Sequence, residues 1–246
     1  MASALFWIPE TCTRFSVDPT YAGGNASFFD DIEKDLPNFE FVKLEYSGHG
    51  TRHKEPLYQD FSELADDMYT ALKIQYNGSE YALFGYSMGT ISLVEVLRRI
   101  IDEKTMPLPG NVFIAAHEPV TKAEFTGYSQ AELDDWVKDR TIRFGTVPEK
   151  LLNNKSFWRM YLPLYRADYS IIGKYRFEDL DLKSTIPATV FYSETDTRFS
   201  DMKLWENYFI GEIEFYQFSG THFFIQNHHT EMASVIEEKM NGRISK

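Results

Sequence analysis

Tyr81-Ala-Leu-Phe-Gly-Tyr-Ser-Met-Gly-Thr90 is a short apolar run that leads into a serine placed between two glycines. The apolar residues before Gly85 favour a buried strand, and the residues from Ser87 to Ile101 have the apolar spacing of an amphipathic helix. Gly85 and Gly89 stand two residues before and two residues after Ser87, where small residues let a strand and a helix pass closely. The stretch therefore predicts a strand, a sharp turn with Ser87 at its tip, and a helix.

This Gly-x-Ser-x-Gly turn is the elbow that presents the nucleophilic serine in enzymes of the α/β-hydrolase fold. The Ser87 hydroxyl is expected at a helix N-terminus, where the helix dipole and free backbone N–H groups stabilise a developing oxyanion. A second Gly-Tyr-Ser sequence, Gly127-Tyr128-Ser129, lacks both the second glycine and a preceding strand. We therefore predict Ser87 as the nucleophile and the backbone N–H of Met88 as one oxyanion donor.

Short apolar runs alternate with longer amphipathic stretches elsewhere in the chain, the pattern of a mostly parallel central sheet flanked by helices. The length of 246 residues suits a single α/β domain, residues 1–246. We expect strands at 14–17, 39–45, 81–84, 111–116, 188–192 and 213–218. We expect helices at 26–36, 60–75, 87–101 and 230–240.

Residues 121–181 contain no convincing strand but show helical patterns at 130–139, 150–162 and 167–178. Long insertions in compact domains are often functional. We expect this segment to form a helical lid inserted between two strands of the sheet. The alternative is that these helices simply cover one face of the sheet.

The predicted base follows from the order of the triad in this fold, which is serine, acid and then histidine. His222 lies in Ser219-Gly-Thr-His-Phe-Phe224, just after the last predicted strand, from where its imidazole can reach Ser87. His117 ends an earlier strand and could line the site without acting as the base. His228 and His229 fall at the start of the last helix and are expected at the surface.

The predicted acid is Asp196, which follows the strand at 188–192. Glu194 in the same turn is one alternative. Glu118, at the end of the preceding strand, is another, because some acyl-thioesterase domains place their acid there. The second oxyanion donor should come from a loop after an early strand, and Tyr21 in Tyr21-Ala-Gly-Gly24 is the candidate, because its glycines allow close backbone approach.

The overall composition excludes several classes of partner. The formal net charge is -12, which disfavours nucleic acid and anionic membranes as partners. The single cysteine, Cys12, allows no internal disulfide, and no stretch approaches the roughly 18 apolar residues of a membrane span. The N-terminus lacks the positive start of a signal peptide. We expect a cytoplasmic protein, and a monomer.

Five segments in chain order together resemble the type II thioesterases that work beside nonribosomal peptide and polyketide synthases. The segments are Tyr21-Ala-Gly-Gly-Asn-Ala-Ser27, Tyr46-Ser-Gly-His-Gly-Thr-Arg-His-Lys-Glu-Pro56, Gly85-Tyr-Ser-Met-Gly89, Leu162-Pro-Leu-Tyr-Arg-Ala-Asp168 and Gly220-Thr-His-Phe-Phe224. The chain departs from the family at Tyr86, where the family has histidine, and at Ala115-Ala-His-Glu-Pro119, where it tends to have Ser-Gly-x-x-Ala-Pro. The family also places its first strand directly before the Tyr-Ala-Gly-Gly loop. Here either residues 14–17 form that strand or a loop is inserted.

The resemblance implies hydrolysis of an acyl thioester on the phosphopantetheine arm of a carrier protein, for editing or product release. Ser87 would attack the carbonyl, His222 would transfer protons, and Asp196 would orient the imidazole, with no metal or cofactor on the enzyme. Because carrier proteins are often acidic too, docking would need a local basic patch. Candidate residues for that patch are Arg98, Arg99, Lys150, Lys155 and Arg159.

Three other functions remain open on the same fold. A small-molecule carboxylesterase or lipase would use the same triad, since one triad serves esters and thioesters. An acyltransferase or cyclase would differ only in the nucleophile that resolves the acyl-enzyme. A binding module that kept the fold without the chemistry is disfavoured by the presence of all three triad residues. The sequence does not identify the acyl group, the pathway or the cognate carrier.

Overall fold

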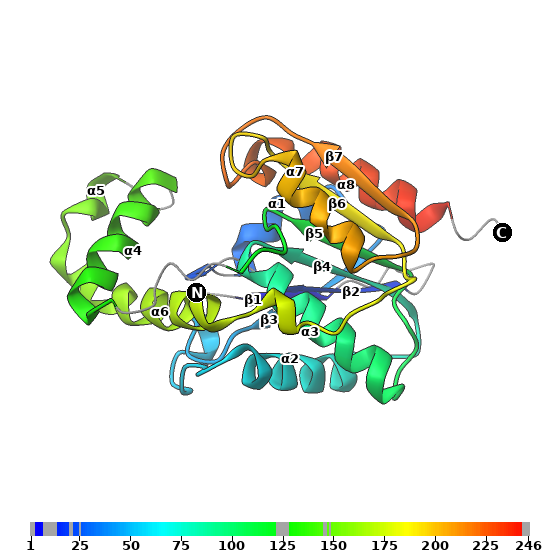
Figure 1. Cartoon of the computed structure of the whole chain (residues 1–246), viewed down its shortest axis with the longest axis horizontal. Coiled ribbons are helices and arrows are strands. Elements are labelled where there is room, and N and C mark those ends of the chain that lie inside the picture. The colour runs from blue at the N-terminus through cyan, green and yellow to red at the C-terminus, as the bar shows by residue number, and fades with distance from the viewer. Residues whose placement is uncertain are drawn as a thin grey trace.

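A seven-stranded, mostly parallel sheet forms the centre of the protein (Figure 1). The computed structural model describes residues 3–6, 14–19, 22–24, 26–121, 128–144, 147 and 149–242. The strands are β1 (Ser3–Phe6), β2 (Arg14–Pro19), β3 (Glu40–Glu45), β4 (Glu80–Tyr86), β5 (Asn111–Ala115), β6 (Ala188–Tyr192) and β7 (Ile213–Gln217). Their spatial order is β1-β3-β2-β4-β5-β6-β7, and β1 runs antiparallel to its neighbours β2 and β3.

The six predicted strands are all present, with ends that differ by a few residues. Strand β2 lies directly before the Ala22–Gly24 turn and is the strand that the family resemblance requires at that point. Strand β1 is an additional edge strand that we did not predict.

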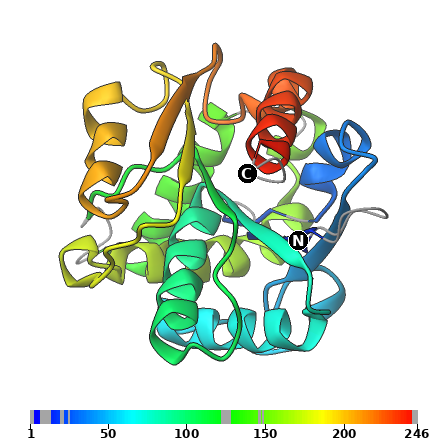
Figure 2. The same ribbon diagram turned by 90° about the vertical axis from the view of Figure 1, so that its right-hand side faces the viewer.

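Helices cover both faces of the sheet (Figure 1, Figure 2). Helices α1 (Asp30–Lys34) and α8 (Ile225–Asn241) pack on one face, and α2 (Phe61–Gln75) and α3 (Met88–Glu103) pack on the other. Along β4, Phe84 and Tyr86 join the core under α1 and α8, while Tyr81 and Leu83 join the core under α2 and α3. This alternation follows from the two-residue period of a strand and explains why β4 is apolar on both sides.

Shorter elements complete the fold. They are α7 (Phe199–Met202) and the 3₁₀ helices Ala26–Phe29, Gly50–Arg52, Phe177–Asp179 and Lys203–Asn207. The helix predicted at 26–36 is therefore wrong in extent, because its first turn is 3₁₀ and its α-helical part ends at Lys34. The last helix begins at Ile225, earlier than predicted. Among the described residues, no helix has both the length and the apolar character needed to cross a bilayer.

Between β5 and β6 the described residues include three α-helices that project beyond the sheet (Figure 1). They are α4 (Gln130–Phe144), α5 (Glu149–Leu152) and α6 (Lys155–Lys174), and the described part of residues 121–181 contains no named strand. Helix α6 continues through Pro163, so the two separate helices predicted at 150–162 and 167–178 are wrong. That these helices act as a lid stays a prediction, and we call them the lid helices below.

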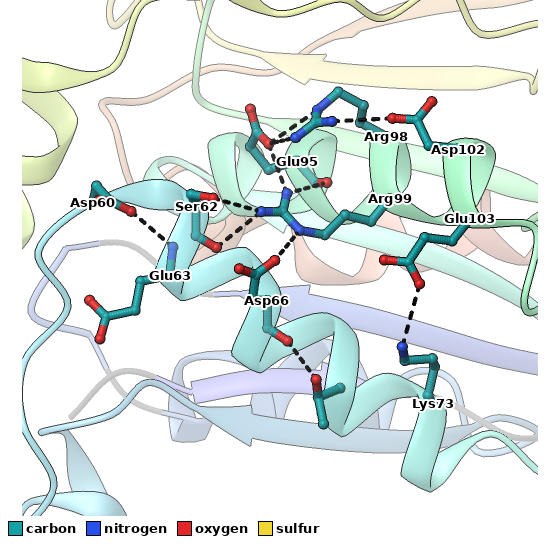
Figure 3. A network of polar contacts seen from close by, with 11 residues as sticks. Asp60, Ser62, Glu63, Asp66, Lys73, Glu95, Arg98, Arg99, Asp102 and Glu103 are labelled. Carbon is teal, nitrogen blue, oxygen red and sulfur yellow. Dashed lines mark hydrogen bonds and ion pairs between the residues drawn. The ribbon is translucent and has the colours of Figure 1, made fainter.

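A partly buried polar network joins α2 to α3 (Figure 3). The Arg99 side chain, 7% exposed, donates to Asp66 Oδ1 at 2.7 Å and to Glu95 Oε2 at 2.9 Å. Arg98 pairs with the same Glu95 oxygen at 3.1 Å. The Tyr175 hydroxyl, at the end of α6, donates to Glu95 Oε1 at 2.9 Å. Arg98 and Arg99 are thus engaged with neighbouring acids, which makes them poor candidates for a carrier-docking patch.

Candidate active site

The turn between β4 and α3 has the strained geometry of a nucleophile elbow. Ser87 lies at φ 56° and ψ -120°, a left-handed conformation that side-chain-bearing residues rarely adopt. A Cβ at Gly85 would stand 2.6 Å from the Gly89 carbonyl oxygen, so this position requires glycine. The Ser87 N–H donates to Ala115 O at 2.8 Å and holds the turn against the end of β5. Strain of this kind persists where the surrounding structure enforces it, and it is concentrated at functional sites.

Ser87, His222 and Asp196 form a continuous chain of hydrogen bonds. His222 Nε2 lies 2.8 Å from Ser87 Oγ, and His222 Nδ1 lies 2.8 Å from Asp196 Oδ2. Because a carboxylate accepts hydrogen bonds, Nδ1 carries the proton in this arrangement and Nε2 can accept from the serine hydroxyl. The His222 and Asp196 side chains are 9% and 12% exposed. The structure thus brings together the three residues that the sequence suggested for nucleophile, base and acid.

The two loops that carry the acid and the base are tied to each other. Asp196 lies in a turn after β6, in which its N–H donates to Ser193 O at 3.0 Å. The hydroxyls of Ser193 and Thr195 both donate to the carbonyl of Gly220, two residues before His222. These contacts fix the spacing between the carboxylate and the imidazole.

The alternative acids take other partners. Glu194 is exposed and its Oε1 accepts from the backbone N–H of Phe199 at 3.1 Å, at the start of α7. Glu118 is buried and lines the cavity at Ser87, where its Oε2 accepts from the Thr197 hydroxyl at 3.2 Å. The Nδ1 of His222 is engaged by Asp196, which favours Asp196 as the acid.

Of the two predicted oxyanion donors, Met88 is the first residue of α3 and Tyr21 lies outside the described residues. The first amides of a helix have no acceptor within it, so the Met88 N–H suits an oxyanion. Ala22, the next residue after Tyr21, lines the cavity together with Ser87. The N–H of Gly23 donates to Asp168 Oδ2 at 2.8 Å, so the loop is held by a residue of α6.

A buried ion pair that the sequence did not suggest anchors this loop. Asp168 Oδ2 also lies 3.1 Å from His49 Nε2, and His49 Nδ1 lies 3.0 Å from the Ser47 carbonyl. Both ring nitrogens face acceptors, an arrangement that favours a proton on each nitrogen of His49. Burial alone would lower the pKa of His49, but the charge and hydrogen bond of Asp168 raise it above its ordinary value.

A cavity of about 290 Å³ opens over the Ser87 hydroxyl, between the lid helices and the sheet. Half of the lining residues on the lid side are aromatic, namely Phe144, Tyr165 and Tyr169. The Phe144 ring stacks on the His222 imidazole at a centroid distance of 4.5 Å and an interplanar angle of 13°. The last residue of α4 therefore packs directly against the predicted base.

The remaining histidines fall as expected. His117 lines the cavity with its Nδ1 2.7 Å from the Glu118 carbonyl, whereas His228 and His229 contact Ser219 and Asp35 and are not among its lining residues. Within the described part of the chain, His, Cys, Asp and Glu side chains form no group of three that could hold a metal ion.

The elbow, the adjoining His–Asp pair and the cavity lie within a sequence that matches a known family. The model of the thioesterase domain family matches residues 20–240. The chain belongs to this family.

Individual relatives of this thioesterase agree with that assignment. The medium-chain S-acyl fatty acid synthase thioesterase of Rattus norvegicus is 26% identical over 228 residues, which are 91% of this chain and 85% of the relative. The structure of ClbQ from the colibactin NRPS/PKS pathway matches with a TM-score of 0.80 at 24% identity, over 92% of this chain and 97% of that one. The type II thioesterase BorB from the borrelidin biosynthetic cluster matches with a TM-score of 0.77 at 24% identity, over 95% and 97%. The predicted fold and the predicted membership of a thioesterase family are confirmed.

Proposed function

We propose that this thioesterase hydrolyses acyl thioesters held on the phosphopantetheine arm of a carrier protein, in the service of nonribosomal peptide or polyketide synthesis. The observation that carries the proposal is the unbroken hydrogen-bonded chain from Ser87 through His222 to Asp196, three residues that line one cavity. The membership of the thioesterase domain family and the assembly-line setting named for ClbQ support it.

In the proposed mechanism, His222 Nε2 takes the proton of the Ser87 hydroxyl as its oxygen attacks the thioester carbonyl. The tetrahedral oxyanion is stabilised by the Met88 N–H and by a second backbone donor, for which Tyr21 remains the candidate. Collapse of this intermediate breaks the carbon–sulfur bond, and the imidazolium returns its proton to the leaving pantetheine thiolate.

Water then completes the cycle. His222 deprotonates the water as it attacks the acyl-Ser87 ester, and the proton returns to Ser87 as the acid is released. Asp196 holds His222 in the required tautomer and stabilises its positive charge in both half-reactions. The chemistry needs no metal or cofactor on the enzyme, because the pantetheine belongs to the carrier.

The proposal is tested by incubating acyl-loaded carrier protein with the wild type and with Ser87→Ala and reading the intact mass of the carrier. Loss of the acyl mass with the wild type alone would support hydrolysis through Ser87. Ser129→Ala is the matched control, because Ser129 stands in the second Gly-Tyr-Ser sequence and caps α4 instead of contacting His222. A wild type that leaves several acyl carriers intact but cleaves p-nitrophenyl esters would replace the proposal with a carboxylesterase. Hydrolysis by Ser87→Ala would refute the nucleophile.

A further inference from the structure

Arg140 of α4 lines the cavity that contains Ser87, and one nitrogen of its guanidinium has no hydrogen-bond partner. This nitrogen is the Nε atom, which is buried. Within the described residues, no carboxylate lies within ion-pair distance of Arg140. Buried polar groups are normally hydrogen-bonded and buried charges are normally paired. The Nε of Arg140 is therefore a buried donor that lacks an acceptor.

Other arginines among the described residues have such acceptors. Arg99 pairs with Glu95 and Asp66, and Arg166, on the neighbouring helix α6, pairs with Asp134 at 2.7 Å. The guanidinium of Arg140 is instead surrounded by aromatic rings. Its central carbon lies 4.7 Å from the Phe144 centroid, 5.0 Å from that of Trp136 and 5.9 Å from that of Tyr169. Ring faces attract the cation but accept no hydrogen bond in the guanidinium plane.

The aromatic contacts place this charge close to the reacting atoms. The Phe144 ring contacts both groups, because its centroid lies 4.7 Å from the central carbon of the Arg140 guanidinium and 4.5 Å from the centroid of the His222 imidazole. The phosphate of a pantetheine arm lies at the far end of that arm from the thioester sulfur. The group nearest to Arg140 would therefore belong to the acyl chain.

We propose that Arg140 binds an anionic group at the end of the acyl chain, so that the preferred substrates are thioesters whose acyl group carries a carboxylate. A planar guanidinium matches a carboxylate with two parallel hydrogen bonds, and such charge-assisted bonds are strong away from water. The small cavity and its aromatic walls restrict this substrate to a short chain. The inference rests on the proposed thioester hydrolysis and adds the substrate class.

The test uses thioesters of N-acetylcysteamine, a thiol that mimics the reactive end of pantetheine and has no phosphate. The ratio of kcat/KM for the glutaryl thioester to kcat/KM for the pentanoyl thioester is measured for the wild type and for Arg140→Gln. These acyl groups have equal numbers of carbons and differ in the carboxylate. We expect the wild type to favour glutaryl and Arg140→Gln to lower the ratio by roughly tenfold or more.

Two further variants sharpen the result. Arg143→Gln removes an exposed arginine that is on the same helix but not among the lining residues, and it should keep the wild-type ratio. Arg140→Lys keeps the positive charge but not the planar guanidinium, and it should retain part of the preference for the glutaryl thioester. This variant also tests the inference if Arg140→Gln fails to fold.

Three outcomes would overturn the inference. A wild type that hydrolyses the pentanoyl thioester but shows no preference for glutaryl would refute it while leaving the proposed function intact. An effect of Arg140→Gln seen only with full phosphopantetheine thioesters would assign Arg140 to the arm phosphate instead. A wild type that cleaves neither thioester, nor any acyl carrier, would refute the proposed function and the inference together.

Discussion

The phenol of Tyr86 donates a 2.6 Å hydrogen bond to the backbone carbonyl of His222. Tyr86 directly precedes Ser87, so this bond joins the elbow to the loop that carries the base. The Tyr86 side chain is fully buried, and burial raises its pKa well above the ordinary value, which keeps the phenol protonated and donating. The residue that departs from the family pattern thus has a definite position-holding contact in this chain.

Replacing Tyr86 with phenylalanine should weaken both stability and turnover. The ring stays in the core, but the His222 carbonyl loses its partner in a buried site, at a cost of about 1–3 kcal/mol. Because His222 is then less well fixed, kcat should fall more than KM changes. Urea unfolding and steady-state kinetics measure the two effects. An unchanged unfolding midpoint would argue against a structural role for the hydroxyl.

Asp196→Asn should lower kcat by roughly 10³- to 10⁴-fold, because an amide no longer holds His222 in the productive tautomer. Glu194→Gln is the matched control, since Glu194 lies two residues away but accepts from the Phe199 N–H, and it should change kcat by less than about twofold. Single-turnover assays on acyl carrier would measure both. If Glu118→Gln lowered kcat more than Asp196→Asn did, Glu118 after β5 would be the acid of the triad instead.

Gly85→Ala should severely disturb the elbow. The added methyl group would stand 2.6 Å from Gly89 O and 2.8 Å from Thr90 Cα, both of which are backbone atoms. Overpacking of this kind costs about 1–3 kcal/mol or more, and relief would displace Ser87. Thermal unfolding and labelling of Ser87 by a fluorophosphonate probe would both report it. Gly242→Ala, at φ -61° after the last helix, should be close to neutral by comparison.

The His49–Asp168 pair should stabilise the folded protein at acidic pH and lose this effect as the pH rises. Since the pKa of His49 is raised in the folded state, its contribution is fully present below the unfolded value of about 6.5 and is lost as pH rises through the folded value. The free energy of unfolding of the wild type should therefore exceed that of Asp168→Asn most at acidic pH. This difference between the two proteins should become smaller at alkaline pH. A difference that stayed constant from pH 5.5 to 9 would contradict an ionised His49.

Local sequence patterns were enough to predict the strands of the sheet and the three triad residues, which follow the ends of β4, β6 and β7. Strand β6 matches its predicted bounds, because five apolar or β-branched residues stand between a proline and a polar turn. The elbow pattern fixed Ser87, and the order of strands then selected Asp196 and His222. Each of these predictions depends on residues adjacent in the chain and on a general rule of the fold.

What the sequence could not provide depends on how distant segments pack. His49 and Asp168 are 119 residues apart, and neither has a local pattern that identifies its partner. The break expected near Pro163 is absent because Trp158, Leu162 and Tyr165 lie on one buried face of α6, and their packing outweighs the hydrogen bond that proline removes. The role suggested for Arg140 likewise arises from the stacking of Phe144 on His222, a contact between two separate parts of the chain.

Asp168 belongs to a lid helix, yet its Oδ2 atom accepts the hydrogen bond of the Gly23 N–H and also contacts the His49 ring. The unit that would have to be exchanged to alter acyl selectivity is therefore larger than the inserted helices. A chimaera that took residues 121–181 from a relative would place a foreign helix α6 against the resident Gly23 and His49. Successful grafts should be those in which the turn at 22–24, position 49 and the incoming helix come from one parent.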